Sequence, residues 1–123
     1  MRYLAAITAL LILLGGMSCT TPDADVVIRL TNPSNKTIAF GGYYNVQSTG
    51  DSVGMSGSTP KDYTVTCKGD NDRVWGKVWK DTTEKNMDVL HISLLVNDKE
   101  QTSGDVVFPG ELLGAQFSVQ IKR

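Results

Sequence analysis

The chain has 123 residues, of which 41% are hydrophobic and 20% are charged. This length and composition provide one domain with one apolar core; they exclude a second domain and argue against a disordered chain. Twelve basic residues against thirteen acidic ones give a net charge of −1, and the basic residues are spread along the chain. The charge balance argues against nucleic acid as a partner and against electrostatic attachment to a membrane.

Residues 1–18 have the organisation of a secretory signal peptide. One basic residue, Arg2, precedes an apolar run from Leu4 to Leu14, and small residues follow. An α-helix needs roughly twenty apolar residues to cross the hydrocarbon core of a bilayer, so this run is too short for a permanent transmembrane helix. We therefore expect residues 1–18 to be removed during export.

The leader ends in Gly16-Met17-Ser18-Cys19, which resembles the lipobox of bacterial lipoproteins. The resemblance implies that Cys19 receives a diacylglycerol, and further acylation such as palmitate, and becomes the first residue of the mature protein. Gly16 departs from the family pattern, in which a branched aliphatic residue is usual at this position. Ordinary cleavage after Ser18, without lipidation, therefore stays open as the alternative.

A lipid anchor would hold the domain on a membrane without any amphipathic helix, because each buried CH₂ group of an acyl chain contributes about 0.8 kcal/mol. By the sorting rule of enteric lipoproteins, Thr20 after the cysteine implies the outer membrane in a Gram-negative source. Residues 19–24 would form the lipidated N-terminus and a short tether. Residues 25–123 would then form the folded domain, close to the membrane.

The mature chain alternates apolar and polar residues with the period of β-strands, and turn residues interrupt it every eight to twelve positions. No stretch shows a sustained helical apolar stripe, so helix should be minor. Residues 48–60, rich in Gly and Ser, predict a long mobile loop. The pattern predicts an all-β fold: a single antiparallel β-sandwich, immunoglobulin-like, with about seven strands. The expected strands cover residues 26–30, 37–47, 63–67, 73–80, 90–96, 101–108 and 115–121.

Cys67 is the one cysteine left within the domain if Cys19 carries lipid. It shares a strand face with Tyr63 and Val65, which favours a small buried hydrophobic residue over a reactive thiol. An immunoglobulin domain would pair such a cysteine with a second one in the domain. If Cys19 is not lipidated, a disulfide bond between Cys19 and Cys67 becomes an alternative.

His91 is the sole histidine, and it alternates out of phase with Leu90 and Ile92, which places it on the polar face of its strand. A solvated surface histidine is therefore favoured over a metal ligand or a general base. The chain has no G-x-S-x-G motif and no plausible Cys-His or Ser-His-Asp set. We expect a non-enzymatic protein, and only chemistry by a carboxylate pair, whose spacing depends on the fold, stays open.

Asp70-Asn71-Asp72 has a superficial likeness to a calcium-binding loop. It lacks the glycine and the distant glutamate of the EF-hand pattern, and a turn rich in Asp and Asn explains the same residues. We therefore expect no metal ion and no cofactor.

One strand places Trp75, Lys77 and Trp79 on one side and small residues on the other. Packing of the tryptophans into the core is favoured, because large aromatic residues supply much of the apolar burial in small domains. In the alternative arrangement the tryptophans form an exposed stripe, extended by Tyr43 and Tyr44, that binds sugars or a partner protein. These five residues are the candidate binding face.

The run LHISLLVNDKEQTSGDVV, residues 90–107, resembles the closing hairpin of small exported β-sandwich proteins, including the mycobacterial small membrane proteins that accompany large lipid transporters. The resemblance implies a strand, a tight turn and a second strand, and it implies an accessory role beside a transporter. These relatives are anchored differently and commonly carry a cysteine pair that this chain lacks, so no functional residue is carried over.

The sequence predicts a membrane-anchored, non-enzymatic lipoprotein of the cell envelope. It would act as a binding or accessory module for a protein or another envelope component, and not for nucleic acid. The alternative is a carbohydrate-binding module that uses an exposed face containing Trp75 and Trp79.

Overall fold

Alternating apolar residues give this protein its strands, as in β1, where buried Val26, Ile28 and Leu30 alternate with more exposed neighbours. The computed structural model describes residues 24–67 and 71–121. The predicted leader and lipid-modified Cys19 lie outside the described residues. The elements in chain order are β1 (Ala24–Thr31), β2 (Ala39–Val46), β3 (Ser52–Ser58), β4 (Lys61–Cys67), β5 (Arg73–Lys80), β6 (Leu90–Val96), β7 (Lys99–Val106), the 3₁₀ helix η1 (Glu111–Leu113) and β8 (Ala115–Gln120).

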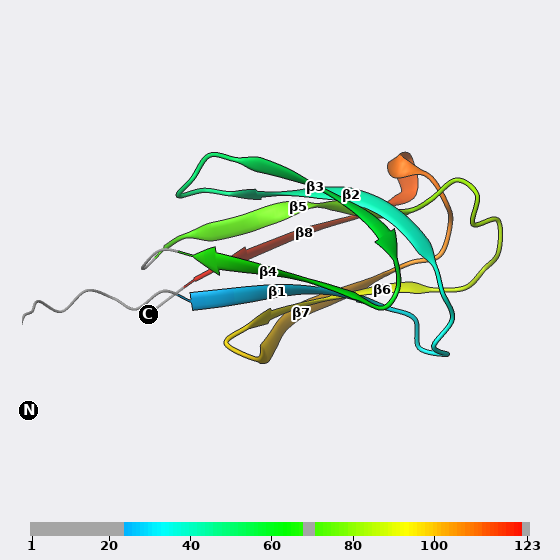
Figure 1. Cartoon of the computed structure of the whole chain (residues 1–123), viewed down its shortest axis with the longest axis horizontal. Coiled ribbons are helices and arrows are strands. Elements are labelled where there is room, and N and C mark those ends of the chain that lie inside the picture. Colours follow the sequence, from blue (N-terminus) through cyan, green and yellow to red (C-terminus); the bar gives the residue numbers. More distant parts are fainter. Residues whose placement is uncertain (1–23, 68–70, 122–123) are drawn as a thin grey trace, which may run out of the picture.

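The strands form two four-stranded antiparallel sheets, in the orders β4-β1-β6-β7 and β3-β2-β5-β8 (Figure 1). Each sheet turns one face toward the other, and apolar side chains from both sheets fill the space between them. The predicted all-β sandwich is therefore confirmed. The buried core includes Val26, Ile28, Leu30, Ile92 and Leu94 from the first sheet and Phe40, Met55, Val74, Val78, Phe117 and Val119 from the second.

Strand β3 lies within the segment 48–60 that the sequence predicts as a long loop, so that prediction is wrong. The segment pairs in antiparallel register with β2, from Ser58 opposite Ala39 to Ser52 opposite Asn45. Met55 is buried and fixes the strand to the core. The described residues thus contain eight strands where about seven were expected, because a strand of glycine and serine has little of the usual strand composition.

The second half of the Asp70-Asn71-Asp72 segment forms a turn, with Asn71 in the left-handed region at φ 65°. The carboxylate of Asp72 is buried and accepts hydrogen bonds from the Ser48 amide at 3.0 Å and the Ser48 hydroxyl at 2.7 Å. Asp72 therefore joins this turn to the β2–β3 turn. No group of three or more potential metal-ligating residues occurs in the parts of the chain that the structure describes.

Lys80, at the end of β5, is completely buried. Its ammonium group lies within hydrogen-bond distance of the Asn86 carbonyl (2.9 Å), the Asn86 side-chain oxygen (3.1 Å), and the carbonyls of Asp88 (2.7 Å) and Val107 (2.8 Å). These acceptors come from the β5–β6 loop and from the residue after β7. One side chain thus holds together the two connections at the end of the sandwich where η1 lies, opposite the start of β1 (Figure 1).

The described residues contain no helix that is long and apolar enough to cross a membrane.

Candidate functional site

Strand β5 turns both tryptophans of the chain toward solvent. Val74 and Val78 are fully buried and Gly76 is buried between them, so Trp75 and Trp79 point to the outer side of sheet β3-β2-β5-β8. The favoured prediction, that the tryptophans pack in the core, is therefore wrong.

The physical reason for this orientation lies at Gly76. A Cβ atom there would come within 2.0 Å of the Tyr43 carbonyl oxygen and within 2.9 Å of the Phe117 ring. The interior side of β5 has no room for a side chain at this position, so the large residues of the strand occupy the opposite side.

Tyr43 joins the tryptophans on the outer side and Tyr44 does not. Tyr43 lies opposite Lys77 in the β2–β5 register and is 36% exposed. Tyr44 is partly buried and packs against the core, because successive residues of a strand point to opposite faces. The prediction that Tyr44 extends the exposed stripe is therefore wrong, whereas Tyr43 takes the predicted position.

Trp79 lies across the neighbouring strand at Gly41. A Cβ atom on Gly41 would come within 2.9 Å of the indole nitrogen, so the absence of a side chain there gives the indole its place. The Trp79 ring also meets the Tyr43 ring edge to face, with ring centroids 6.3 Å apart and an interplanar angle of 61°. These contacts fix the two aromatic side chains relative to each other.

Trp75, 36% exposed, carries a cation on its ring. The Arg73 guanidinium lies 5.4 Å from the ring centroid, within the range of a cation–π contact. Lys77 follows on the same side of the strand and is partly exposed. No described carboxylate forms an ion pair with Arg73 or Lys77.

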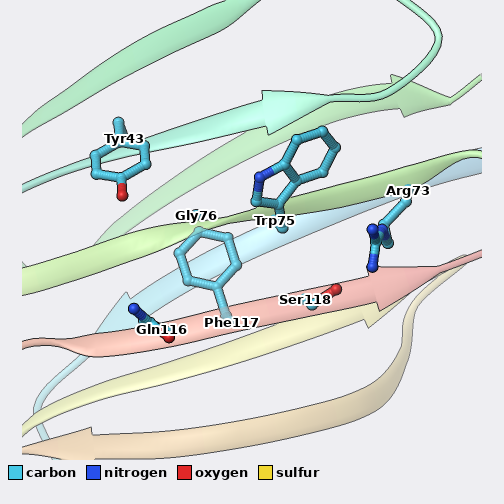
Figure 2. A pocket seen from close by; sticks show the side chains of 7 residues that line it. All are labelled: Tyr43, Arg73, Trp75, Gly76, Gln116, Phe117 and Ser118. Atoms are coloured by element: carbon cyan, nitrogen blue, oxygen red, sulfur yellow. The ribbon is translucent and has the colours of Figure 1, made fainter. Parts of the chain in front are cut away.

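Tyr43, Arg73 and Trp75 border a shallow concavity of about 380 Å³. Figure 2 shows Tyr43 from β2 and Trp75 and Arg73 from β5, with Gln116 and Ser118 from β8 along the opposite border. Gly76 and Phe117 complete its lining. We call the outward surface formed by Tyr43, Arg73, Trp75, Lys77, Trp79, Gln116 and Ser118 the aromatic face.

His91 lies on the other sheet, away from the aromatic face. It is partly exposed on the outer side of β6, as predicted, and its Nδ1 atom lies 2.6 Å from a carboxylate oxygen of Asp105 on β7. The ring is therefore positioned by a surface partner.

Cys67 is fully buried at the end of β4, as the alternation predicts. Burial raises the pKa of its thiol to about 11, and the negative charges of Asp72 and Asp25 add to the increase. The thiol is therefore protonated and unreactive at neutral pH.

A second exposed apolar region lies at the η1 end of the sandwich and was not predicted. Leu112 is 94% exposed, and Leu113, Phe108 and Met87 are also exposed. Their segments are the connections that Lys80 holds together. The Glu-Leu-Leu run between two glycines was a signal that pointed to an exposed apolar turn.

Comparison with protein-family models, curated proteins and solved structures finds no match for this chain. The aromatic face and the lipobox-like segment 16–19 are therefore the two features of the chain that bear on its function.

Proposed function

We propose that this protein is a membrane-anchored, non-enzymatic lipoprotein of the cell envelope that binds an envelope component or a partner protein through the aromatic face. The observation that carries the proposal is the outward orientation of Trp75, Trp79 and Tyr43 on one sheet face, where Trp75 and Tyr43 line a concavity and Trp79 packs against Tyr43. Large aromatic side chains normally supply core burial, and their placement on one exposed face is typical of a binding surface.

The anchor part of the proposal is supported by the resemblance of residues 16–19 to a lipobox. Strand β1 begins at Ala24, five residues after Cys19. Five residues span at most about 17 Å when fully extended. A lipid on Cys19 would therefore keep the domain within a short distance of the membrane surface.

The non-enzymatic part is supported by the chemistry of the concavity. Its lining supplies aromatic rings, an amide, a hydroxyl and a guanidinium group, and it includes no histidine, aspartate or glutamate. General acid–base catalysis most often uses one of those three residue types. The lining is suited to hold a ligand by stacking and hydrogen bonding.

The carbohydrate-binding alternative uses the same surface, and the exposed tryptophans favour it specifically. The proposal and the alternative agree if the ligand is a sugar chain of the envelope, because such a chain is both an envelope component and a carbohydrate. A partner protein remains the other class of ligand.

Retention on isolated cell-envelope material tests the proposal. We expect detergent-extracted full-length protein to be retained, Trp75→Ala to lose retention, and Phe108→Ala to behave as wild type, since Phe108 is an exposed aromatic residue at the η1 end. Circular dichroism would check that each variant is folded. Equal retention of wild type and Trp75→Ala would overturn the role of the aromatic face.

The anchor is tested separately by the intact mass of the membrane-extracted chain and of Cys19→Ser. We expect an N-terminus at Cys19 that carries acyl mass, and loss of that mass and of membrane association in the variant. An unmodified wild-type chain would overturn the lipoprotein assignment and leave a secreted protein.

A further inference from the structure

The aromatic face carries positive charge and no negative charge on its strand positions. Arg73 and Lys77 are its cations, and the remaining outward positions of β2, β3, β5 and β8 hold aromatic residues, alanine, glycine, serine, asparagine or glutamine. The whole chain has a net charge of −1. The face is therefore locally cationic in a protein that is not basic, and a local positive potential attracts an anionic ligand.

On the outer side of sheet β4-β1-β6-β7, the arginine side chain is paired with a carboxylate. There Arg29 forms two hydrogen bonds with Asp62, at 3.1 and 3.2 Å. The Arg73 guanidinium group, in contrast, forms no ion pair with a described carboxylate and lies over the Trp75 ring. A guanidinium group held on an aromatic ring keeps donors free for a carboxylate, which it binds in a bidentate geometry.

The spacing of the two cations indicates a ligand with repeated charges. Arg73 and Lys77 lie on the same side of β5, four residues apart, and an extended strand covers roughly 13 Å over four residues. Trp75 lies between them in sequence. A small ligand with a single acidic group would engage one cation, whereas a chain with repeated acidic groups can engage both.

The uncharged groups of the face match a polyhydroxylated ring. An aromatic surface packs against the C–H face of a sugar ring through apolar contact and weak C–H interactions. Gln116 and Ser118, on the opposite border of the concavity, each supply donors and acceptors for vicinal hydroxyl groups (Figure 2). The concavity is shallow and open to solvent, so a sugar ring bound there can be part of a longer chain.

From these observations, and resting on the proposed function, we infer that the aromatic face binds an acidic polysaccharide, a chain of sugar rings that carry carboxylate groups. Trp75 and Tyr43 contact the rings, Gln116 and Ser118 bind hydroxyl groups, and Arg73 and Lys77 bind successive carboxylates.

Polygalacturonate and its methyl ester form a matched pair of probes, because they share the same rings and differ in charge. Calorimetric titration of the full-length protein in detergent should show saturable binding of polygalacturonate. Affinity for the methyl ester should be lower by about tenfold or more, since the ester loses the charge-assisted hydrogen bonds to the cations of the face. Added salt should weaken the binding of polygalacturonate and leave the weaker binding of the ester nearly unchanged.

Two variants separate stacking from charge. Arg73→Gln should weaken polygalacturonate binding by about tenfold and leave ester binding unchanged, because only the charged contact is lost. Trp75→Ala should abolish binding of both probes. Lys99→Gln, which removes an exposed cation on β7 of the other sheet, is the matched control and should bind both probes as wild type does.

Equal affinity for the two probes would overturn the inference in favour of a neutral glycan. Tighter binding of a single-stranded oligothymidylate than of polygalacturonate would overturn it in favour of a stacked, phosphate-bearing chain. If neither polysaccharide binds while Trp75→Ala still loses retention on envelope material, the inference is wrong and the proposed function stands. If Trp75→Ala loses polygalacturonate binding and is still retained on envelope material, the result contradicts the proposed function instead.

Discussion

Strand β5 has one lysine on each of its two sides, Lys77 and Lys80, and their surroundings differ. Lys77 is partly exposed on the aromatic face and has no described carboxylate partner. Lys80 is completely buried three residues later, surrounded by backbone and side-chain oxygens at 2.7–3.1 Å. The buried ammonium group has its hydrogen bonds supplied within the fold, whereas the exposed one is available to a ligand.

The η1 end and the aromatic face show the same contrast between polar groups bonded within the fold and polar groups exposed to solvent. At the η1 end, polar contacts point inward and serve to hold two chain connections together. On the aromatic face, the side chains with hydrogen-bonding capacity point outward around a concavity. Removing a side chain should therefore cost stability at the first region and binding at the second.

The largest effect on stability is expected for Lys80→Met. The substitution leaves several buried oxygens without a donor, and each such group costs about 1–3 kcal/mol, so we expect a loss of about 3 kcal/mol in the free energy of unfolding. Urea denaturation measures this change. Lys77→Met, the same substitution at the partly exposed lysine of the aromatic face, should lose less than about 1 kcal/mol. Similar losses for the two variants would break the comparison.

Gly76→Ala tests why the tryptophans face outward. Its Cβ atom would lie 2.0 Å from a backbone oxygen, so strands β2 and β5 must separate, and overpacking of this kind costs about 1–3 kcal/mol. Gly54→Ala is the control, since nothing lies within 4 Å of its Cβ position. Thermal unfolding that gives the two variants the same midpoint would contradict a closed interior at Gly76.

Cys67 should make the stability depend on pH at the alkaline end. Its pKa is raised in the folded protein from 9.0 to about 11, so the unfolded chain ionises first as the pH rises. The stabilising effect is complete below pH 9.0 and is lost as the pH approaches 11, by on the order of 2 kcal/mol. Urea midpoints measured across this range should fall more steeply for wild type than for Cys67→Ala. Parallel pH profiles would exclude a buried thiol as the cause.

The smallest stability effect is expected for Gly41→Ala. The new methyl group would meet the end of the Trp79 side chain and not the backbone, so the indole can move aside at a cost below about 1 kcal/mol. The displaced indole should change the tryptophan emission spectrum. An unchanged spectrum would mean that Trp79 does not depend on Gly41 for its place.

Sequence periodicity was sufficient for the strands that carry regular apolar alternation. β1, β6 and β8 were predicted because Val, Ile, Leu and Phe recur at every second position. β3 was missed because Met55 is its sole buried residue and glycine and serine occupy most other positions. Its pairing depends on the long-range register with β2, which no local pattern contains.

The sequence predicted four residues of the candidate site, Tyr43, Trp75, Lys77 and Trp79, but it did not predict that the tryptophans face outward. Alternation placed Trp75, Lys77 and Trp79 together, but a period of two assigns two faces without stating which one is inward. The deciding contacts are those of Gly76 with Tyr43 and Phe117, which come from three different strands. Gln116 and Ser118 were missed because only the fold brings β8 beside β5. Arg73 lies two residues before Trp75 on the same strand, so the alternation of β5 was a signal that could have found it.

Tryptophan fluorescence tests the central claim most directly, because the chain contains two tryptophans and both lie on the aromatic face. Full-length protein would be titrated with solubilised envelope polysaccharide. A saturable change in emission that Phe108→Ala retains and Trp75→Ala loses is the predicted result. Binding of the polysaccharide, shown by sedimentation, with no change in tryptophan emission would place the ligand elsewhere and contradict the aromatic face as the binding surface.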